Sequence, residues 1–313
     1  MKGFLTHRRY TATTVFVDHF SGLSFVYNQQ TTTAAETVEA KLAFERYANT
    51  HGVRIGHYHA DNGIFAEAEF LQSINGTPGQ SISFCGVNAH HQNGRAEKKI
   101  RDLQDQARTM ILHAQQRWPL AVTANLWPYA VRMANDVANF APGAQSGVSP
   151  IEEFSQVAVA PRVRHSHAFG SPVYVLDSTL QTAGKRIQKW KQRARIGLYL
   201  GTSPRHSRKV ALVLSLETGR VSPQFHLRFD DLFDTLRPLA GNAVPESKWQ
   251  AAVGLTTAKK RKPAVDETGT IPEAEQVQWI GRDDAASTSG RTERDARSHP
   301  EKQRIPKWPR SHG

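Results

Sequence analysis

Cysteine is nearly absent from this chain, because Cys85 is the one cysteine among 313 residues. A single thiol excludes a disulfide framework, and it excludes any zinc site built on cysteine pairs within the chain. The scarcity of cysteine favours a reducing compartment such as the cytosol or the nucleus. The sequence also has no evident internal repeat.

Long hydrophobic runs are missing as well. No stretch approaches the run of about 18 apolar residues that a membrane-spanning helix needs. The first ten residues, MKGFLTHRRY, lack the apolar segment of a secretory signal. Hydrophobic residues still make up 39% of the chain, which is enough for a globular core. The length predicts about two domains.

Acidic residues are outnumbered: 40 lysines and arginines face 28 aspartates and glutamates, and the net charge is +12. A soluble chain this basic is expected to bind a polyanion, most often nucleic acid, through salt-dependent phosphate contacts. The alternative is a basic surface that binds no partner.

Residues 11–157 alternate between strand and helix patterns after a short N-terminal remnant, residues 1–10. Residues 11–28 are typical of two strands around a turn. Further strands are expected at 53–59 and 80–85, and helices at 33–50, 66–74, 95–116 and 127–142. This order predicts an α/β core, in which helices flank a mixed sheet.

Hydrophobic spacing within two of these helices indicates which faces are buried. In helix 33–50 the apolar face is expected to include Ala35, Val38 and Leu42, with Lys41 and Glu45 outside it. In helix 95–116 the expected buried stripe comprises Ile100, Leu103, Ala107, Met110 and Ile111.

Residues 158–240 change to short strands with frequent glycine and proline, which predicts a small all-β, barrel-like module. The stretch 178–216 has no aspartate or glutamate, but it contains Trp190 and many cations. We expect a DNA-phosphate surface, rather than a merely solvated charged face. The candidate DNA-binding residues are Lys185, Arg186, Lys189, Lys191 and Arg193.

Residues 241–313 are poor in large apolar side chains and are expected to form a mostly disordered, basic tail. One basic run in the tail is a candidate nuclear-localisation signal or an electrostatic DNA tether. It comprises Lys259, Lys260, Arg261 and Lys262.

Three carboxylates occupy distinctive positions: Asp18 and Asp61 at the ends of expected strands, and Glu97 in the first turn of an expected helix. Neighbouring strand ends hold metal ligands rigidly, and a helix N-terminus favours a carboxylate. Three such acids are able to bind two divalent metal ions for phosphodiester chemistry. Each acid taken alone is equally compatible with a turn or capping role.

The motifs around these acids are DHFSG, HADNG and HQNGRAEKK, with 35 residues (positions 62 to 96) between Asp61 and Glu97. This pattern closely resembles the catalytic core of retroviral and retrotransposon integrases, which have a ribonuclease H-like fold. SGVSPIEEF, HAFGSPVYVL, GLYLGTSPRHS and FHLRFDDLFDT extend the similarity to about residue 238 and favour the copia-type long-terminal-repeat branch.

The resemblance implies that Asp18, Asp61 and Glu97 form the catalytic, metal-binding triad, with Mg²⁺ or Mn²⁺ as the cofactor. It implies site-shaping roles for Asn62 and Asn93, and DNA contacts from Lys98 and Arg101. The implied activity is trimming of DNA 3′ ends followed by strand transfer. The implied partner is double-stranded DNA, bound by a homo-oligomer in the nucleus, with no membrane involved.

Some features depart from the family pattern. His90-His91 stand where Pro-Gln is frequent, and Lys98 stands where arginine is common. Only about ten residues precede the first strand, so the family's His-His-Cys-Cys zinc module is absent and no zinc is expected. The chain is therefore expected to be a polyprotein fragment or a decayed copy. The alternatives are an inactive DNA-binding remnant of an integrase and a ribonuclease H-like nuclease.

Overall fold

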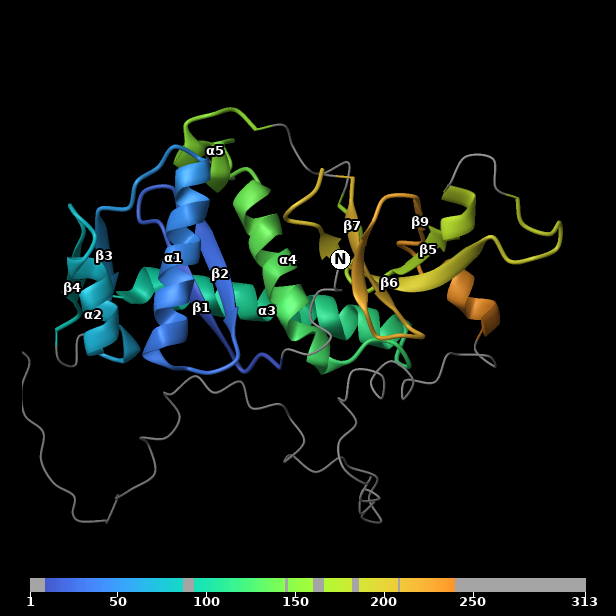
Figure 1. Ribbon diagram of the computed structural model, residues 1–313, viewed down its shortest axis with the longest axis horizontal. Coiled ribbons are helices and arrows are strands. Elements are labelled where there is room, and N and C mark those ends of the chain that lie inside the picture. The colour runs from blue at the N-terminus through green and yellow to red at the C-terminus, as the bar shows by residue number, and fades with distance from the viewer. Residues whose placement is uncertain are drawn as a thin grey trace, which may run out of the picture. The chain divides into compact units, whose positions relative to one another are not determined.

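The computed structural model describes residues 9–86, 93–143, 146–159, 166–181, 186–207 and 209–239 (Figure 1). These residues lie within one compact unit, residues 1–257. The expected tail at 241–313, with its basic run at 259–262, falls outside the described residues, and so does Lys185. None of the described helices is long and apolar enough to cross a bilayer.

The first part of the chain contains helices and both parallel and antiparallel strands, which confirms the α/β expectation. Its strands are β1 (Ala12–Val17), β2 (Ser24–Gln29), β3 (His57–Ala60) and β4 (Ser81–Phe84). Its helices are α1 (Ala34–Thr50), α2 (Ala68–Asn75), α3 (Gly94–Arg117), α4 (Trp127–Phe140) and α5 (Pro150–Ser155).

Strands β1 and β2 form an antiparallel hairpin with helices on both faces (Figure 1). Successive side chains of a strand point to opposite faces. Phe16 and Phe25 therefore pack towards α1, where the Phe16 and Phe44 rings stack 5.0 Å apart. Val15 and Val26 pack on the other face, in the core that contains α3 and α4. The hairpin is the middle layer of three.

Strands β3 and β4 pair in parallel and form a second ladder. The expected strand at 53–59 begins only at His57, so β3 has four residues. Among the described strands no hydrogen-bond ladder joins β3 to β1, and the mixed sheet is present as two separate pairs. Side chains bridge the gap instead, since the Tyr58 and Phe16 rings meet edge to face at 6.2 Å.

The buried face of α1 differs from the expected one. Leu42 is exposed, whereas Lys41 is fully buried. The Lys41 ammonium lies 3.0 Å from Glu45 and 3.3 Å from the Ser73 carbonyl. The reason is tertiary: α2 packs beside α1 and provides a carbonyl partner that allows a cation inside. The expectation for Leu42 and Lys41 was therefore wrong.

Helix α3 buries Leu103, Ala107 and Ile111 as expected, whereas Ile100 and Met110 are only partly buried. Farther along, α3 meets the second half of the chain at a very close approach. A Cβ added to Gly170 would lie 2.6 Å from the Cβ of Ala114, and Gly170 has a φ of +73°. Glycine has no Cβ to clash with Ala114 and adopts a positive φ at little cost, so it suits this position.

The second part of the chain is a five-stranded antiparallel sheet, in the order β8-β7-β6-β5-β9. Its strands are β5 (Pro172–Leu176), β6 (Ala194–Thr202), β7 (Ala211–Ser215), β8 (Val221–Gln224) and β9 (Leu227–Phe229). The expected all-β character of this part is thus confirmed, whereas the described strands form an open sheet and not the expected barrel-like one. Its apolar face shares one core with α3 and α4. A domain boundary at residue 157 stays a prediction.

Helix α4 is attached to β2 by buried side-chain amides. Asn139 accepts a hydrogen bond from the Ser24 N–H at 2.9 Å and donates one to the Ser24 carbonyl at 2.7 Å. One turn earlier, Asn135 accepts a 2.7 Å bond from the Ser24 hydroxyl. All three residues are buried, so these bonds satisfy polar groups that water cannot reach.

Replacing Asn139 by alanine should lower the free energy of unfolding by about 2–3 kcal/mol, because it leaves the buried Ser24 amide and carbonyl unpaired. Urea denaturation measures the change. The control is Asn125→Ala at an exposed position, which should stay within about 0.5 kcal/mol of wild type. Equal effects of the two variants would contradict the role of the Ser24 contacts.

Candidate functional site

Asp18 follows the last residue of β1 and opens the turn into β2. Its N–H donates to the Leu23 carbonyl at 2.8 Å. Its carboxylate Oδ2 accepts hydrogen bonds from the Ser21 N–H at 2.8 Å and the Ser21 hydroxyl at 2.7 Å. Among the described residues, no donor contacts Oδ1 of this half-buried carboxylate. One oxygen therefore fixes the side chain and the other is available to a ligand.

Asp61 follows β3, as the sequence predicts, and is exposed. Its Oδ1 accepts a 3.3 Å bond from the Gly63 N–H. The neighbouring Asn62 donates to the Cys85 carbonyl at 3.1 Å and so connects this turn to the end of β4. The site-shaping role of Asn62 stays a prediction.

Two histidines precede Asp61 on the same face of β3. His57 contacts the hydroxyls of Ser81 and Ser83 at 2.8 and 2.9 Å, and His59 contacts Ser83 at 2.9 Å. These partners are serines of β4, and no group of three metal-ligating side chains forms in the described part of the chain. Both histidines therefore have hydrogen-bond partners within the β3–β4 pair.

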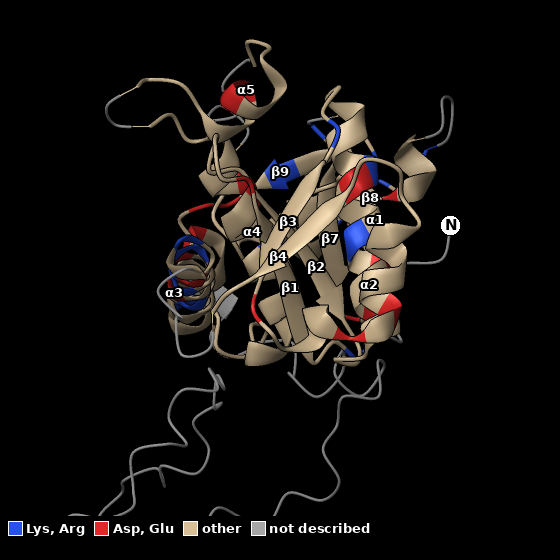
Figure 2. Ribbon diagram, turned by 90° about the vertical axis from the view of Figure 1, so that its left-hand side faces the viewer, with Lys and Arg blue, Asp and Glu red and all other residues tan. Residues whose placement is uncertain are grey.

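Glu97 is in the first turn of α3 and is exposed, as are Lys98 and Arg101. Figure 2 shows acidic and basic residues mixed along the ribbon of this helix. Asn93, at the N-cap, makes no capping bond with its side chain. Burial lowers the pKa of Lys99, which lies two residues after Glu97.

The three acids do not form an assembled metal centre in the described residues, since no group of three or more His, Cys, Asp and Glu side chains is gathered there. Their chemistry fits Mg²⁺ or Mn²⁺, because all are hard carboxylate oxygens at element ends. Residues 87–92 connect β4 to α3, and these residues lie outside the described ones. The assignment of Asp18, Asp61 and Glu97 stays a prediction.

The basic segment before β6 is displayed at the surface. Arg186, Lys189, Lys191 and Arg193 are all exposed. The ammonium of Lys189 lies 5.4 Å from the centroid of the Trp190 ring. The four cations lie within eight residues of one connection, residues 186–193, and are well separated in sequence from the three acids. Their DNA-binding role stays a prediction.

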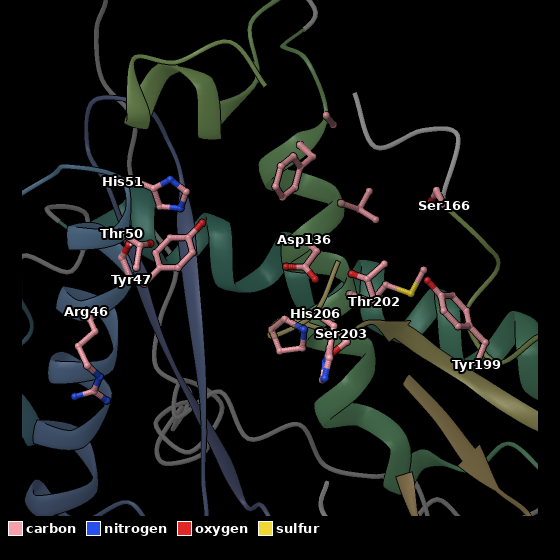
Figure 3. A pocket seen from close by; sticks show the side chains of 15 residues that line it. Arg46, Tyr47, Thr50, His51, Asp136, Ser166, Tyr199, Thr202, Ser203 and His206 are labelled. Carbon is pink, nitrogen blue, oxygen red and sulfur yellow. The ribbon is translucent and has the colours of Figure 1, made fainter. Parts of the chain in front are cut away.

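A cavity of about 640 Å³ lies between α1, α4 and the end of β6 (Figure 3). None of the three predicted acids lines it. Its polar side chains include Arg46, His51, Asp136, Ser203 and His206. Sequence reasoning missed this cavity, because its lining comes from segments far apart in the chain and carries no local motif.

Some of the polar groups in this cavity have a shifted pKa or a hydrogen-bond partner. Burial lowers the pKa of His51. Burial, followed by the neighbouring Asp136 charge, raises the pKa of Tyr199. The Ser203 hydroxyl and the His206 Nδ1 are 2.7 Å apart. The cavity is a mixed polar and apolar hollow, and its side chains contain no set of acids for metal chemistry.

Comparison with known proteins agrees with the motif pattern. Over 262 residues, 82% of the chain, the sequence is 26% identical to the Retrovirus-related Pol polyprotein from transposon RE1 of Arabidopsis thaliana. The chain resembles a retrotransposon Pol polyprotein. It spans about a sixth of that relative, 16% of its length. No model of a protein family matches the sequence.

Solved structures of retroviral integrases are also similar. The HTLV-2 integrase catalytic core domain in complex with magnesium is 20% identical, covering 49% of this chain and 99% of that one, with a TM-score of 0.35. The BIV integrase catalytic core domain is 22% identical, covering 48% and 89%, with a TM-score of 0.36. The simian T-cell lymphotropic virus intasome, solved with a PP2A regulatory subunit, is 15% identical over 73% and 82%, with a TM-score of 0.36.

Replacing Ser21 by alanine removes the hydroxyl that donates to Asp18 but leaves the backbone bond in place. Unfolding free energy should fall by about 1 kcal/mol, because Asp18 is partly exposed and recovers some hydration. Chemical denaturation measures this change. Ser207→Ala, at an exposed serine, is the matched control and should be nearly neutral. A neutral Ser21→Ala would show that the hydroxyl does not hold the turn.

Proposed function

We propose that this chain is the integrase segment of a copia-type retrotransposon Pol polyprotein. It would trim the 3′ ends of the element's DNA and join them to target DNA. The observation that carries the proposal is the similarity to a transposon Pol polyprotein over 82% of the chain. The net charge of +12 supports a polyanionic substrate.

Asp18, Asp61 and Glu97 would hold Mg²⁺ or Mn²⁺ through their carboxylate oxygens. When bound, a pair of such ions activates the attacking oxygen and stabilises charge on the leaving oxygen. Ser21 orients the Asp18 carboxylate, and Asn62 fixes the Asp61 turn to β4. Lys98 and Arg101 lie exposed on α3, close in sequence to Glu97, where they would bind DNA phosphates.

Double-stranded DNA, as element ends and as target, is the proposed partner, and a homo-oligomer is the proposed assembly. The exposed cations before β6 would contribute phosphate contacts away from the acids. The basic run Lys259–Lys262 would direct the chain to the nucleus, where its target DNA lies.

A second candidate is a DNA-binding remnant that has lost catalysis. The observation that favours it is the lack of an assembled group of three acids among the described residues. Such a remnant would keep the fold and the basic segment, and would bind DNA without joining it.

Replacing Asp61 by asparagine should lower strand transfer at least about 100-fold, because the neutral amide no longer balances a divalent cation. Folding should be nearly unchanged, since Asp61 is exposed and makes one 3.3 Å bond. The measurement is joining of oligonucleotides carrying the element's ends, with Mn²⁺, alongside DNA binding and thermal unfolding.

Glu67→Gln is the matched control, because Glu67 is an exposed acid six positions away that belongs to no metal-binding motif. It should retain strand transfer. Full activity of Asp61→Asn would overturn the assignment of Asp61. A wild-type chain that binds DNA but never joins it would favour the remnant.

A further inference from the structure

Trp190 is displayed at the tip of a tight turn. The N–H of Lys191 donates to the Gln188 carbonyl at 3.0 Å, which closes a turn with Lys189 and Trp190 in the middle. The Trp190 side chain is 90% exposed, more than any other large hydrophobic residue in the described part of the chain. It contributes nothing to the core, so folding does not explain an indole at this position.

The turn is surrounded by positive charge. Arg186, Lys189, Lys191 and Arg193 are exposed within four residues of Trp190. The stretch 178–216 contains no acid, and no ion pair neutralises these four cations within the described residues. The nearest preceding acid, Asp177, accepts bonds from the Thr179 N–H and hydroxyl at 2.8 and 2.6 Å. These bonds, and to a smaller extent the nearby charge of Lys191, lower the pKa of Asp177, so one acid does lie close to the cations. An exposed aromatic ring among cations suits a partner that is anionic and has a flat surface for stacking.

The chain after this turn enters β6, a strand of the buried sheet. The Asp177 N–H donates to the Arg193 carbonyl at 2.8 Å, which connects the end of β5 to the start of β6. β6 then continues through the fully buried residues Leu198 and Leu200. The turn that carries Trp190 therefore ends three residues before a strand that is anchored in the buried sheet.

Nucleic acid fits this surface better than a lipid membrane does. Membrane-surface segments bury several apolar side chains together. Among residues 186–193 the only large apolar side chains are those of Trp190 and Ile187, and Ile187 is partly buried. An exposed aromatic side chain between cations is the usual arrangement for binding unpaired nucleotides, because the base stacks and the cations contact the backbone phosphates. A paired base offers its face to its neighbours and not to the protein.

We propose that Trp190 stacks on an unpaired DNA base next to a duplex, while Lys189, Lys191 and Arg193 hold the flanking phosphates. This inference rests on the proposed function: trimming one strand of a DNA end leaves nucleotides of the other strand unpaired. The basic segment would then recognise the trimmed end as well as binding duplex DNA through charge.

The test compares three DNAs bound by the full chain, measured by fluorescence anisotropy. They are a blunt duplex, the same duplex with a three-nucleotide 5′ overhang, and that overhang with abasic sites. Wild type should bind the normal overhang about 5- to 150-fold more tightly than the abasic one, the range expected for stacking of one base. Trp190→Ala should lose this preference and keep its affinity for the blunt duplex, whereas Trp190→Phe should keep part of it.

Two control variants separate stacking from charge and from general aromatic exposure. Lys191→Ala should weaken binding to all three DNAs alike and lower the salt dependence by about one phosphate contact. Phe225→Ala removes another exposed aromatic residue, one that follows β8 in the same sheet, and should keep the preference for the overhang.

The outcomes distinguish this inference from the proposed function. Equal weakening of all three DNAs by Trp190→Ala would overturn stacking and leave DNA binding intact. A wild-type chain that binds none of the DNAs would overturn the proposed function as well. Trp190-dependent binding to phosphatidylserine vesicles without any preference for the overhang would assign the turn to a membrane and overturn stacking.

Discussion

The amide of Asn139 closes two hydrogen bonds on the backbone of Ser24, in a place that water does not reach. This contact binds α4 to β2, and α4 also packs against β6 of the antiparallel sheet. The helix thus has a partner on each side, and the two halves of the described chain share its packing. Because a buried amide or carbonyl without a partner is costly, the register between α4 and β2 is strongly specified.

The same contact lies next to the Asp18 turn. Ser24 follows Leu23, whose carbonyl accepts the Asp18 N–H. The Ser21 hydroxyl and N–H then orient the Asp18 carboxylate. Hydrogen bonds on both sides of the Leu23–Ser24 peptide link therefore connect helix α4 with one oxygen of the proposed metal ligand. Asp61 is positioned separately, through Asn62 and β4. The acids are thus held by different elements, and their meeting depends on how those elements pack.

Local patterns in the sequence were sufficient to predict most helices and strands, and to predict the strand and helix ends that carry the three acids. The strand end before Asp18, the Asn62-Gly63 turn and the helix start before Glu97 all have strong local signals, and the structure has them at those places. The resemblance to integrases was also readable, because its motifs are short and specific, and the similarity to a transposon Pol polyprotein agrees with it.

Features that depend on contacts between residues far apart in the chain could not be predicted from the sequence. The buried Lys41 ammonium is paired with the Glu45 carboxylate and the Ser73 carbonyl. The pattern of apolar residues does not show these partners, and it therefore predicted that Lys41 is exposed. The cavity between α1, α4 and β6 likewise has no local motif. The sequence places Trp190 among cations, but its 90% exposure at a turn tip needs the fold. The sequence also did not indicate that, among the described strands, the β3–β4 pair forms no ladder with β1.

The most direct test of Asp18, Asp61 and Glu97 as metal ligands is a crystal structure of the chain with Mn²⁺, with the ions located by anomalous scattering. Manganese bound between the carboxylates of Asp18 and Asp61, with Glu97 at the same centre, is the result that we predict. In crystals saturated with Mn²⁺, the absence of an anomalous peak at these carboxylates would contradict the proposed metal site. Manganese coordinated only by other side chains would contradict it as well.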